Sequence, residues 1–130
     1  MPREMPLTVL SMVHSRDVMP YLVAIKSFAR YVNPRQIVVL CDPSITDFDR
    51  GHIQRHIPHV VLRRSDEFEH PYIPQGGIWE RLYAISEYSR DGYVVQLDAD
   101  TITMLPPAGV IHAVMANTGF VMSGASDAVL

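Results

Sequence analysis

Two aspartates close a hydrophobic run late in the sequence, and their types and spacing suit divalent-metal chemistry. Asp98 and Asp100 follow directly on residues 93–97 (YVVQL), which have the composition of a buried strand. Two carboxylates at the end of a buried strand repel each other and resist desolvation unless a cation or hydrogen-bond donors satisfy them. Mg²⁺ and Mn²⁺ prefer carboxylate oxygen and leave coordination positions free for a diphosphate. The pair therefore predicts a phosphate-handling metal site, with solvated aspartates in an ordinary strand-end turn as the alternative.

The elements that must position these aspartates are visible as apolar runs that alternate with helical patterns along the chain. Strands are expected at residues 7–13, 36–41, 60–62, 93–97 and 120–122. Helices are expected at residues 17–32, 46–57, 78–89 and 110–116. This repetition predicts an α/β fold with a mostly parallel sheet and helices on both faces. Because no internal repeat or linker interrupts it, one domain spanning residues 1–130 is expected.

Ligands of such sheets bind beyond the carboxyl ends of the strands, where the strand order reverses. Four segments of the chain fall at strand ends, namely residues 14–17, 41–42, 63–66 and 98–101. In the third segment, Arg63 and Arg64 are followed at once by Asp66, Glu67 and Glu69, which predicts a solvated, self-neutralising loop. These four segments are the places where a ligand site is expected.

The residues around the aspartates are similar to those of a known family. Arg81-Leu82, Tyr88-Ser89 and Leu97-Asp98-Ala99-Asp100-Thr101 resemble glycogenin-like family 8 glycosyltransferases. In that family, a helix that opens with a basic residue and leucine precedes a Tyr-Ser, a hydrophobic strand and Asp-Ala-Asp-Thr. Residues 122–127 (MSGASD) also resemble the small-residue segment that follows. The resemblance implies a Rossmann-like GT-A nucleotide-diphospho-sugar transferase fold, of which this chain is the incomplete, nucleotide-sugar-binding front half.

The same resemblance implies a UDP-sugar donor, an unidentified acceptor, and Mn²⁺ or Mg²⁺ as cofactor. Asp98 would share metal and ribose contacts, and Asp100 would bind the metal most directly. Arg81 stands where the family has lysine and would reach the phosphates or sugar of the donor; arginine keeps the charge but changes the geometry. These three are the candidate catalytic residues, with a structural ion pair as the alternative for Arg81. The apolar face of the Arg81 helix is expected to consist of Ile78, Leu82 and Ile85.

Further binding residues are implied at the ends of the first two strands. His14, Ser15 and Arg16 would contact the nucleotide, and Asp42 would accept a hydrogen bond from the base. Local structure offers an alternative for some of them, because Ser15 and Asp17 are also suited to capping the first helix. Asp42 precedes a proline and is equally suited to a turn.

Other candidate residues carry weaker signals. His52 and His56 have the i, i+4 spacing of a helical metal pair, but no third ligand accompanies them and an exposed helix face explains them better. Trp79 and Tyr83 could stack on a sugar or a base, or simply pack their helix. Gly76-Gly77 lacks the Lys-Ser/Thr of a phosphate loop and is interpreted as a flexible lead into that helix.

Two other classes of protein stay open on the sequence. Haloacid-dehalogenase-like phosphatases also place Asp-x-Asp at a strand end, but their motif has a threonine where this chain has Ile102. They also need a later lysine, and the chain has none after Lys26. The other class is a non-catalytic nucleotide-binding or assembly module, because the family's acceptor half is missing and His112 is the only later histidine. An unfinished sheet would expose an edge open to homo-oligomerisation.

The overall composition excludes several kinds of protein. At 48% hydrophobic and 19% charged residues, the chain is globular rather than disordered. A net charge of −3 leaves no basic surplus for nucleic acid. No run approaches the roughly 18 apolar residues of a membrane span, and no secretory signal precedes the first strand. The single cysteine, Cys41, has no partner and no adjacent base, so a cytoplasmic location and no catalytic thiol are expected.

Overall fold

Four parallel strands form one sheet in the order β3-β2-β1-β4 in the computed structural model, which describes residues 2–121. The strands are β1 (Glu4–Val13), β2 (Asn33–Cys41), β3 (Val61–Arg64) and β4 (Tyr93–Gln96). From β1 the chain steps outward to β2 and β3, and then returns across β1 to add β4 on the other side. The order therefore reverses between β1 and β4, and their carboxyl ends form the expected ligand edge of the sheet.

The two central strands are buried on both faces, which is why their sequences do not alternate. β1 and β2 pair in register from Thr8 opposite Gln36 to Val13 opposite Cys41. Successive side chains of a strand point to opposite faces, so Val9 and Leu10 belong to two separate cores. A parallel sheet covered on both sides requires this continuous apolar run.

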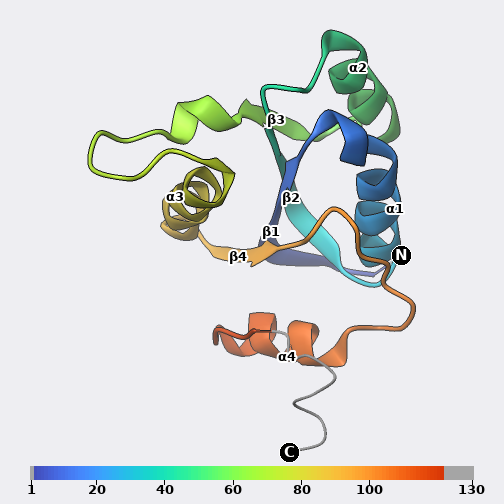
Figure 1. Cartoon of the computed structure of the whole chain (residues 1–130). Coiled ribbons are helices and arrows are strands. Elements are labelled where there is room, and N and C mark those ends of the chain that lie inside the picture. Colours follow the sequence, from blue (N-terminus) through green and yellow to red (C-terminus); the bar gives the residue numbers. More distant parts are fainter. Residues whose placement is uncertain (1, 122–130) are drawn as a thin grey trace, which may run out of the picture.

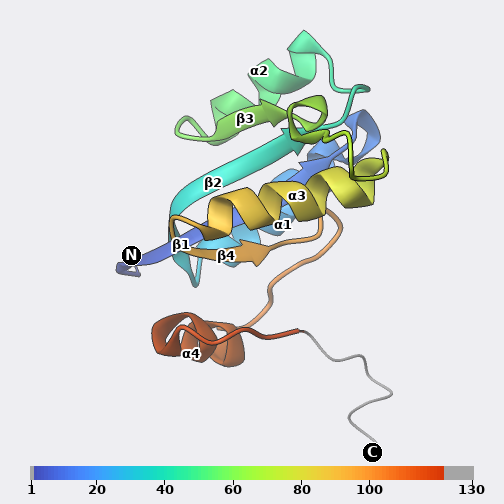
Figure 2. The same ribbon diagram turned by 90° about the vertical axis from the view of Figure 1, so that its left-hand side faces the viewer.

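Helices cover both faces of the sheet, as Figures 1 and 2 show. α1 (Val18–Ala29) and α2 (Asp47–His56) lie on one face, and α3 (Gly77–Ser89) lies on the other. Two 3-10 turns, η1 (Ser15–Asp17) and η2 (Ser65–Phe68), follow β1 and β3. α4 (Ala108–Ala116) packs two buried valines on the α1 side of the core. The parallel α/β architecture predicted from the sequence is confirmed.

Several predicted boundaries are corrected by the structure. The first helix ends at Ala29 rather than Val32, and β2 begins at Asn33, so Asn33-Pro34 opens a strand instead of only ending a helix. Proline is tolerated at the start of a strand, where its missing N–H costs little. The fifth strand expected at residues 120–122 is not formed by Phe120 and Val121, while Met122 lies outside the described residues.

The inner face of α3 also differs from the prediction. Of the predicted apolar face, Ile85 packs against the core as expected, but Ile78 and Leu82 are exposed. Ala84, which was not predicted, is fully buried. The residues that share the sheet side of α3 are Gly77, Arg81, Ala84 and Tyr88, at the spacing of one helix face. Gly77 and Ala84 allow α3 to approach the sheet closely, while Arg81 borders the cleft described below. No helix within residues 2–121 is long and apolar enough to cross a membrane.

Candidate functional site

A cleft of about 380 Å³ opens at the point where the strand order reverses. It lies between the loops that follow β1 and β4, with α3 as its third wall. Its ionisable lining residues are His14, Arg16, Asp17, Arg81, Asp98 and Asp100. Segments far apart in the sequence therefore meet at one edge, and most of the predicted site residues lie together.

The two aspartates of the motif sit on a short loop that is anchored to β1. The Leu97 amide donates to the Leu10 carbonyl at 3.0 Å, and the Ser11 hydroxyl donates to the Leu97 carbonyl at 2.6 Å. These bonds extend the pairing of β4 with β1 by one residue and hold the backbone directly before Asp98 in place. The Thr101 hydroxyl then donates to the Asp98 carbonyl at 3.0 Å, which closes the turn.

The two aspartates are more exposed than their place at the end of a buried strand predicts. Asp98 and Asp100 are exposed, so desolvation alone does not demand a cation beside them. The Gln96 side-chain amide donates to one oxygen of Asp98 at 2.8 Å, which orients that carboxylate. The second carboxylate oxygen remains able to accept a metal or a hydroxyl.

A divalent ion would have to take part of its coordination from the ligand. Within residues 2–121, no group of three or more histidine, cysteine, aspartate and glutamate side chains is placed to hold a metal. Mg²⁺-type sites, however, commonly use one or two carboxylates and complete their shell with phosphate oxygens and water. The residues present fit that kind of site and do not fit a closed structural site.

Arg81 is the cation that α3 brings into the cleft. Its Nε is buried and has no hydrogen-bond partner among the described residues. The ion pair considered as an alternative for Arg81 does not occur in residues 2–121. A buried donor without a partner costs free energy. This is the feature expected of a guanidinium that completes its bonding when a ligand oxygen arrives.

His14 lies between two carboxylates. Its Nδ1 is 3.7 Å from Asp17 and its Nε2 is 3.4 Å from Asp42. Asp17 occupies the N-cap position of α1 but makes no capping hydrogen bond with its side chain. The predicted capping by Asp17 is therefore wrong, because its carboxylate faces His14 and Arg16 instead.

Ser15 and Asp42 serve the local structure behind the cleft. The Ser15 hydroxyl donates to Asp49 of α2 at 2.7 Å, so it neither caps α1 nor lines the cleft. Asp42 accepts from the Ser44 amide at 2.8 Å, which confirms the turn interpretation. Burial opposes ionisation of Asp42, but the Ser44 hydrogen bonds and nearby His14 and Arg16 outweigh it and lower its pKa. Asp42 reaches the site only through His14.

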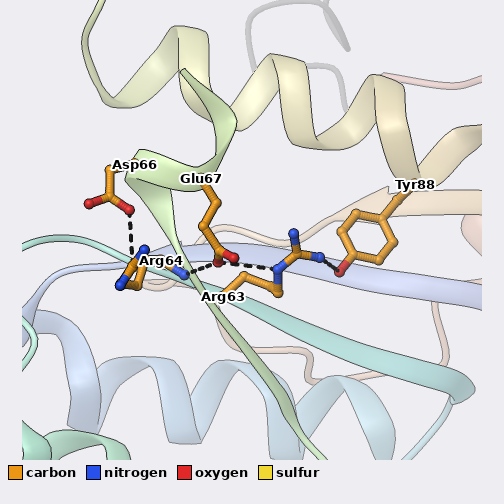
Figure 3. Close-up of polar contacts among 5 residues, drawn as sticks. All are labelled: Arg63, Arg64, Asp66, Glu67 and Tyr88. Carbon is orange, nitrogen blue, oxygen red and sulfur yellow. Dashed lines mark hydrogen bonds and ion pairs between the residues drawn. The ribbon is translucent and has the colours of Figure 1, made fainter. Parts of the chain in front are cut away.

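The arginine pair after β3 forms the self-neutralising network that the sequence predicts (Figure 3). Arg63 donates to Glu67 at 3.2 Å and to the Tyr88 hydroxyl at 3.0 Å, and Arg64 pairs with Asp66 at 3.1 Å. Burial would lower the pKa of Arg63, but the bonds to Tyr88 and Glu67 outweigh it and raise the pKa. This third strand end is occupied by its own side chains and offers no free cation to a ligand.

The weaker candidates fall outside the cleft. His56 is exposed, and Lys26 Nζ lies 2.7 Å from its Nδ1; this contact with Lys26, more than desolvation or His52, lowers the pKa of His56. Cys41 is buried, and that burial raises the pKa of its thiol, which disfavours a reactive thiolate. Gly76 has φ +132° and occupies the N-cap position of α3, a conformation that favours glycine.

Two lining residues were missed by the sequence reasoning. Met12 and Gln96 both line the cleft, one on each of the two strands that border it. Gln96 directly precedes the Asp-containing turn, and its polarity inside an apolar strand was the available signal. Met12 carries no such signal, because methionine in a strand is ordinary core composition.

No family model and no curated protein matches this chain. The case for function therefore depends on the chemistry of the cleft.

Proposed function

We propose that this chain binds a nucleotide-diphospho-sugar together with Mn²⁺ or Mg²⁺ in the cleft, as the donor-binding part of a GT-A glycosyltransferase. The observation that carries the proposal is the meeting of Asp98 and Asp100 with Arg81 where the strand order reverses. Two carboxylates and an unsatisfied guanidinium suit a metal-bound diphosphate, which brings both a cation and several acceptor oxygens.

The proposal gives each part of the cleft a separate task. Asp100 and Asp98 would hold the metal, and Gln96 would keep Asp98 oriented. Arg81 would donate to phosphate oxygens, and Arg16 would add positive charge from the opposite wall. The metal would neutralise the charge that develops on the departing diphosphate when the bond to the sugar breaks.

The nucleoside would extend from the diphosphate along the loop after β1. His14 lies there, held by Asp17 and Asp42, and presents a ring against which a ribose or base can rest. Under this proposal Asp42 acts through His14. The UDP identity of the donor follows from the resemblance to the glycogenin-like family, and so does sugar transfer as the reaction.

The binding claim is tested by calorimetry of UDP with and without Mn²⁺. We expect Mn²⁺-dependent binding with a Kd in the micromolar range, about −8 kcal/mol. Asp100→Ala should weaken it at least about tenfold, which is ~1.4 kcal/mol. Asp91→Ala, an exposed acid outside the cleft, is the matched control and should bind like wild type. Equal UDP binding by wild type and Asp100→Ala would reject the proposal.

The transfer claim needs a separate measurement, because a non-catalytic nucleotide-binding module would also pass the first test. In an incubation with a panel of UDP-sugars and Mn²⁺, water can take the place of the acceptor, so the sugar should be transferred to water and UDP released. The release should be lost in Asp100→Ala. Binding without any release of UDP would leave the chain as a donor-binding module and withdraw the transferase assignment.

A further inference from the structure

A second cavity, independent of the cleft, lies on the outer side of α3. This groove measures about 580 Å³ and is formed by α3 and the loop that leads into it. The residues of the groove that matter here are Tyr72, Trp79, Tyr83, Ser86, Glu87 and Arg90. On this side of α3 the large side chains of Trp79 and Leu82 are exposed. Trp79 is 43% exposed and Tyr72 is 91% exposed.

The rings at this groove are connected to the core through Tyr83, which packs beside the buried ring of Phe68. Phe68 and Tyr83 have ring centroids 6.2 Å apart, Tyr83 stacks on His70 at 6.0 Å, and His70 contacts Tyr72 at 5.5 Å. The Tyr72 amide also donates to His70 Nδ1 at 3.1 Å, which fixes that ring. Distances of this size are typical of favourable aromatic pairs. The rings of Tyr83, His70 and Tyr72 are therefore positioned by their contacts with one another.

The charges at the end of the groove are balanced. Arg90 lies 3.8 Å from Glu87, so the groove offers one carboxylate and one guanidinium side by side. Nucleic acid requires a basic surplus, which this pair does not provide. A ligand that matches the pair must donate to the carboxylate and accept from the guanidinium at neighbouring positions. Hydroxyl groups do both.

From these observations we infer that the groove on the outer side of α3 binds a neutral oligosaccharide. The C–H faces of sugar rings pack on the exposed aromatic rings, while neighbouring hydroxyls bond to Glu87, Arg90 and Ser86. The groove volume lies in the range of ordinary small-ligand sites. A proline-rich segment fits the pair less well, because proline has no N–H to donate to Glu87. The inference does not rest on the proposed function of the cleft.

Trp79 is the only tryptophan of the chain, so its indole N–H signal in an NMR spectrum reports directly on the groove. The intact chain is titrated with maltotriose, cellotriose and chitotriose in the absence of nucleotide. We expect at least one of these trisaccharides to shift the Trp79 signal with a Kd of about 1 mM, a usual strength for such weak sites. Tyr72→Ala should weaken that binding by about threefold to tenfold, because one stacking face is lost.

Phe48→Ala is the matched control, because Phe48 is an exposed aromatic residue on α2 outside the groove. It should leave the titration unchanged. The inference is overturned if none of the trisaccharides shifts Trp79 at about 10 mM, ten times the expected Kd. It is also overturned if Tyr72→Ala binds like wild type, or if a proline decapeptide shifts Trp79 while no trisaccharide does.

Discussion

The side chain that distinguishes the cleft from an ordinary strand-end turn is Arg81. Its buried Nε has no partner among residues 2–121, which lowers stability in the free protein, and it would gain a full hydrogen bond when an acceptor binds. We therefore expect the free energy of unfolding of Arg81→Met to equal that of wild type or to exceed it by up to roughly 1 kcal/mol. The same change should weaken Mn²⁺-UDP binding at least about tenfold.

Urea denaturation and calorimetry measure these two quantities for Arg81→Met. Arg55→Met, which removes an exposed arginine from α2, is the control and should alter neither. A loss of stability in Arg81→Met without any loss of binding would mean that Arg81 is a packing residue. This opposite response of stability and binding separates a ligand-directed side chain from a structural one.

Glu80 gives a pH-dependent prediction at the same scale. Burial first, and then the negative charges of Glu69, Asp42 and Asp66, raise its pKa. The folded state therefore binds the Glu80 proton more tightly than the unfolded state. The stability of the folded protein therefore falls as the pH rises above the ordinary pKa of a glutamate.

We expect Glu80→Gln to have the same free energy of unfolding as wild type in acid. Above the ordinary pKa of a glutamate, the variant should be more stable than wild type. The difference should stay below about 1 kcal/mol, because Glu80 is only half-buried and solvent screens it. Urea denaturation across a pH series measures it, and Glu4→Gln at the start of β1 controls for the loss of a charge. A constant difference at every pH would contradict the assignment.

At the scale of elements, the two adjacent glycines at the start of α3 should respond differently to substitution by alanine. Gly76 has φ +132°, which side-chain-bearing residues rarely adopt, so Gly76→Ala should cost about 1–3 kcal/mol. A Cβ on Gly77 would lie 2.9 Å from the Met12 methyl group, at the end of a flexible side chain that can move. Gly77→Ala should therefore be neutral, or stabilising by up to about 1 kcal/mol from helix propensity.

Urea denaturation of Gly76→Ala and Gly77→Ala measures this difference. Gly109→Ala in α4 is the control, because its added methyl group meets nothing within 4 Å and its φ is not positive. Equal destabilisation by Gly76→Ala and Gly77→Ala would show that close packing, rather than backbone conformation, requires both glycines.

The faces of α3 also show where sequence patterns stop being informative. Ile78 and Leu82 have helical spacing and predict a buried face, yet the sheet side holds Arg81 and Ala84. The pattern identifies an amphipathic helix correctly but cannot tell a core-facing apolar stripe from an outward one. By contrast, the acidic partners of Arg63 and Arg64 were predictable, because they lie within four residues in the sequence, whereas the bond from Arg63 to Tyr88 was not.

At the scale of the whole molecule, the fold class was predictable and the strand order was not. Uninterrupted apolar strands separated by helices require a parallel sheet, whatever the order of its strands. Which strand ends are neighbours depends on long-range packing, and this decides that His14 and Asp98 share a cleft while Asp42 lies outside it. The sequence therefore singles out Asp98, Asp100 and Arg81 as candidates, whereas the cleft that they share was found only in the structure.

The most direct test of the Mn²⁺-diphosphate cleft is paramagnetic broadening of backbone amide signals by Mn²⁺ in the presence of UDP. Mn²⁺ broadens the signals of nuclei close to it, so the position of the ion can be read along the chain. We predict selective, UDP-dependent broadening at residues 14–17 and 98–101 and at Arg81, with the far end of α2 at His56 unaffected. Broadening centred on His52 and His56, or none at residues 98–101, would contradict it.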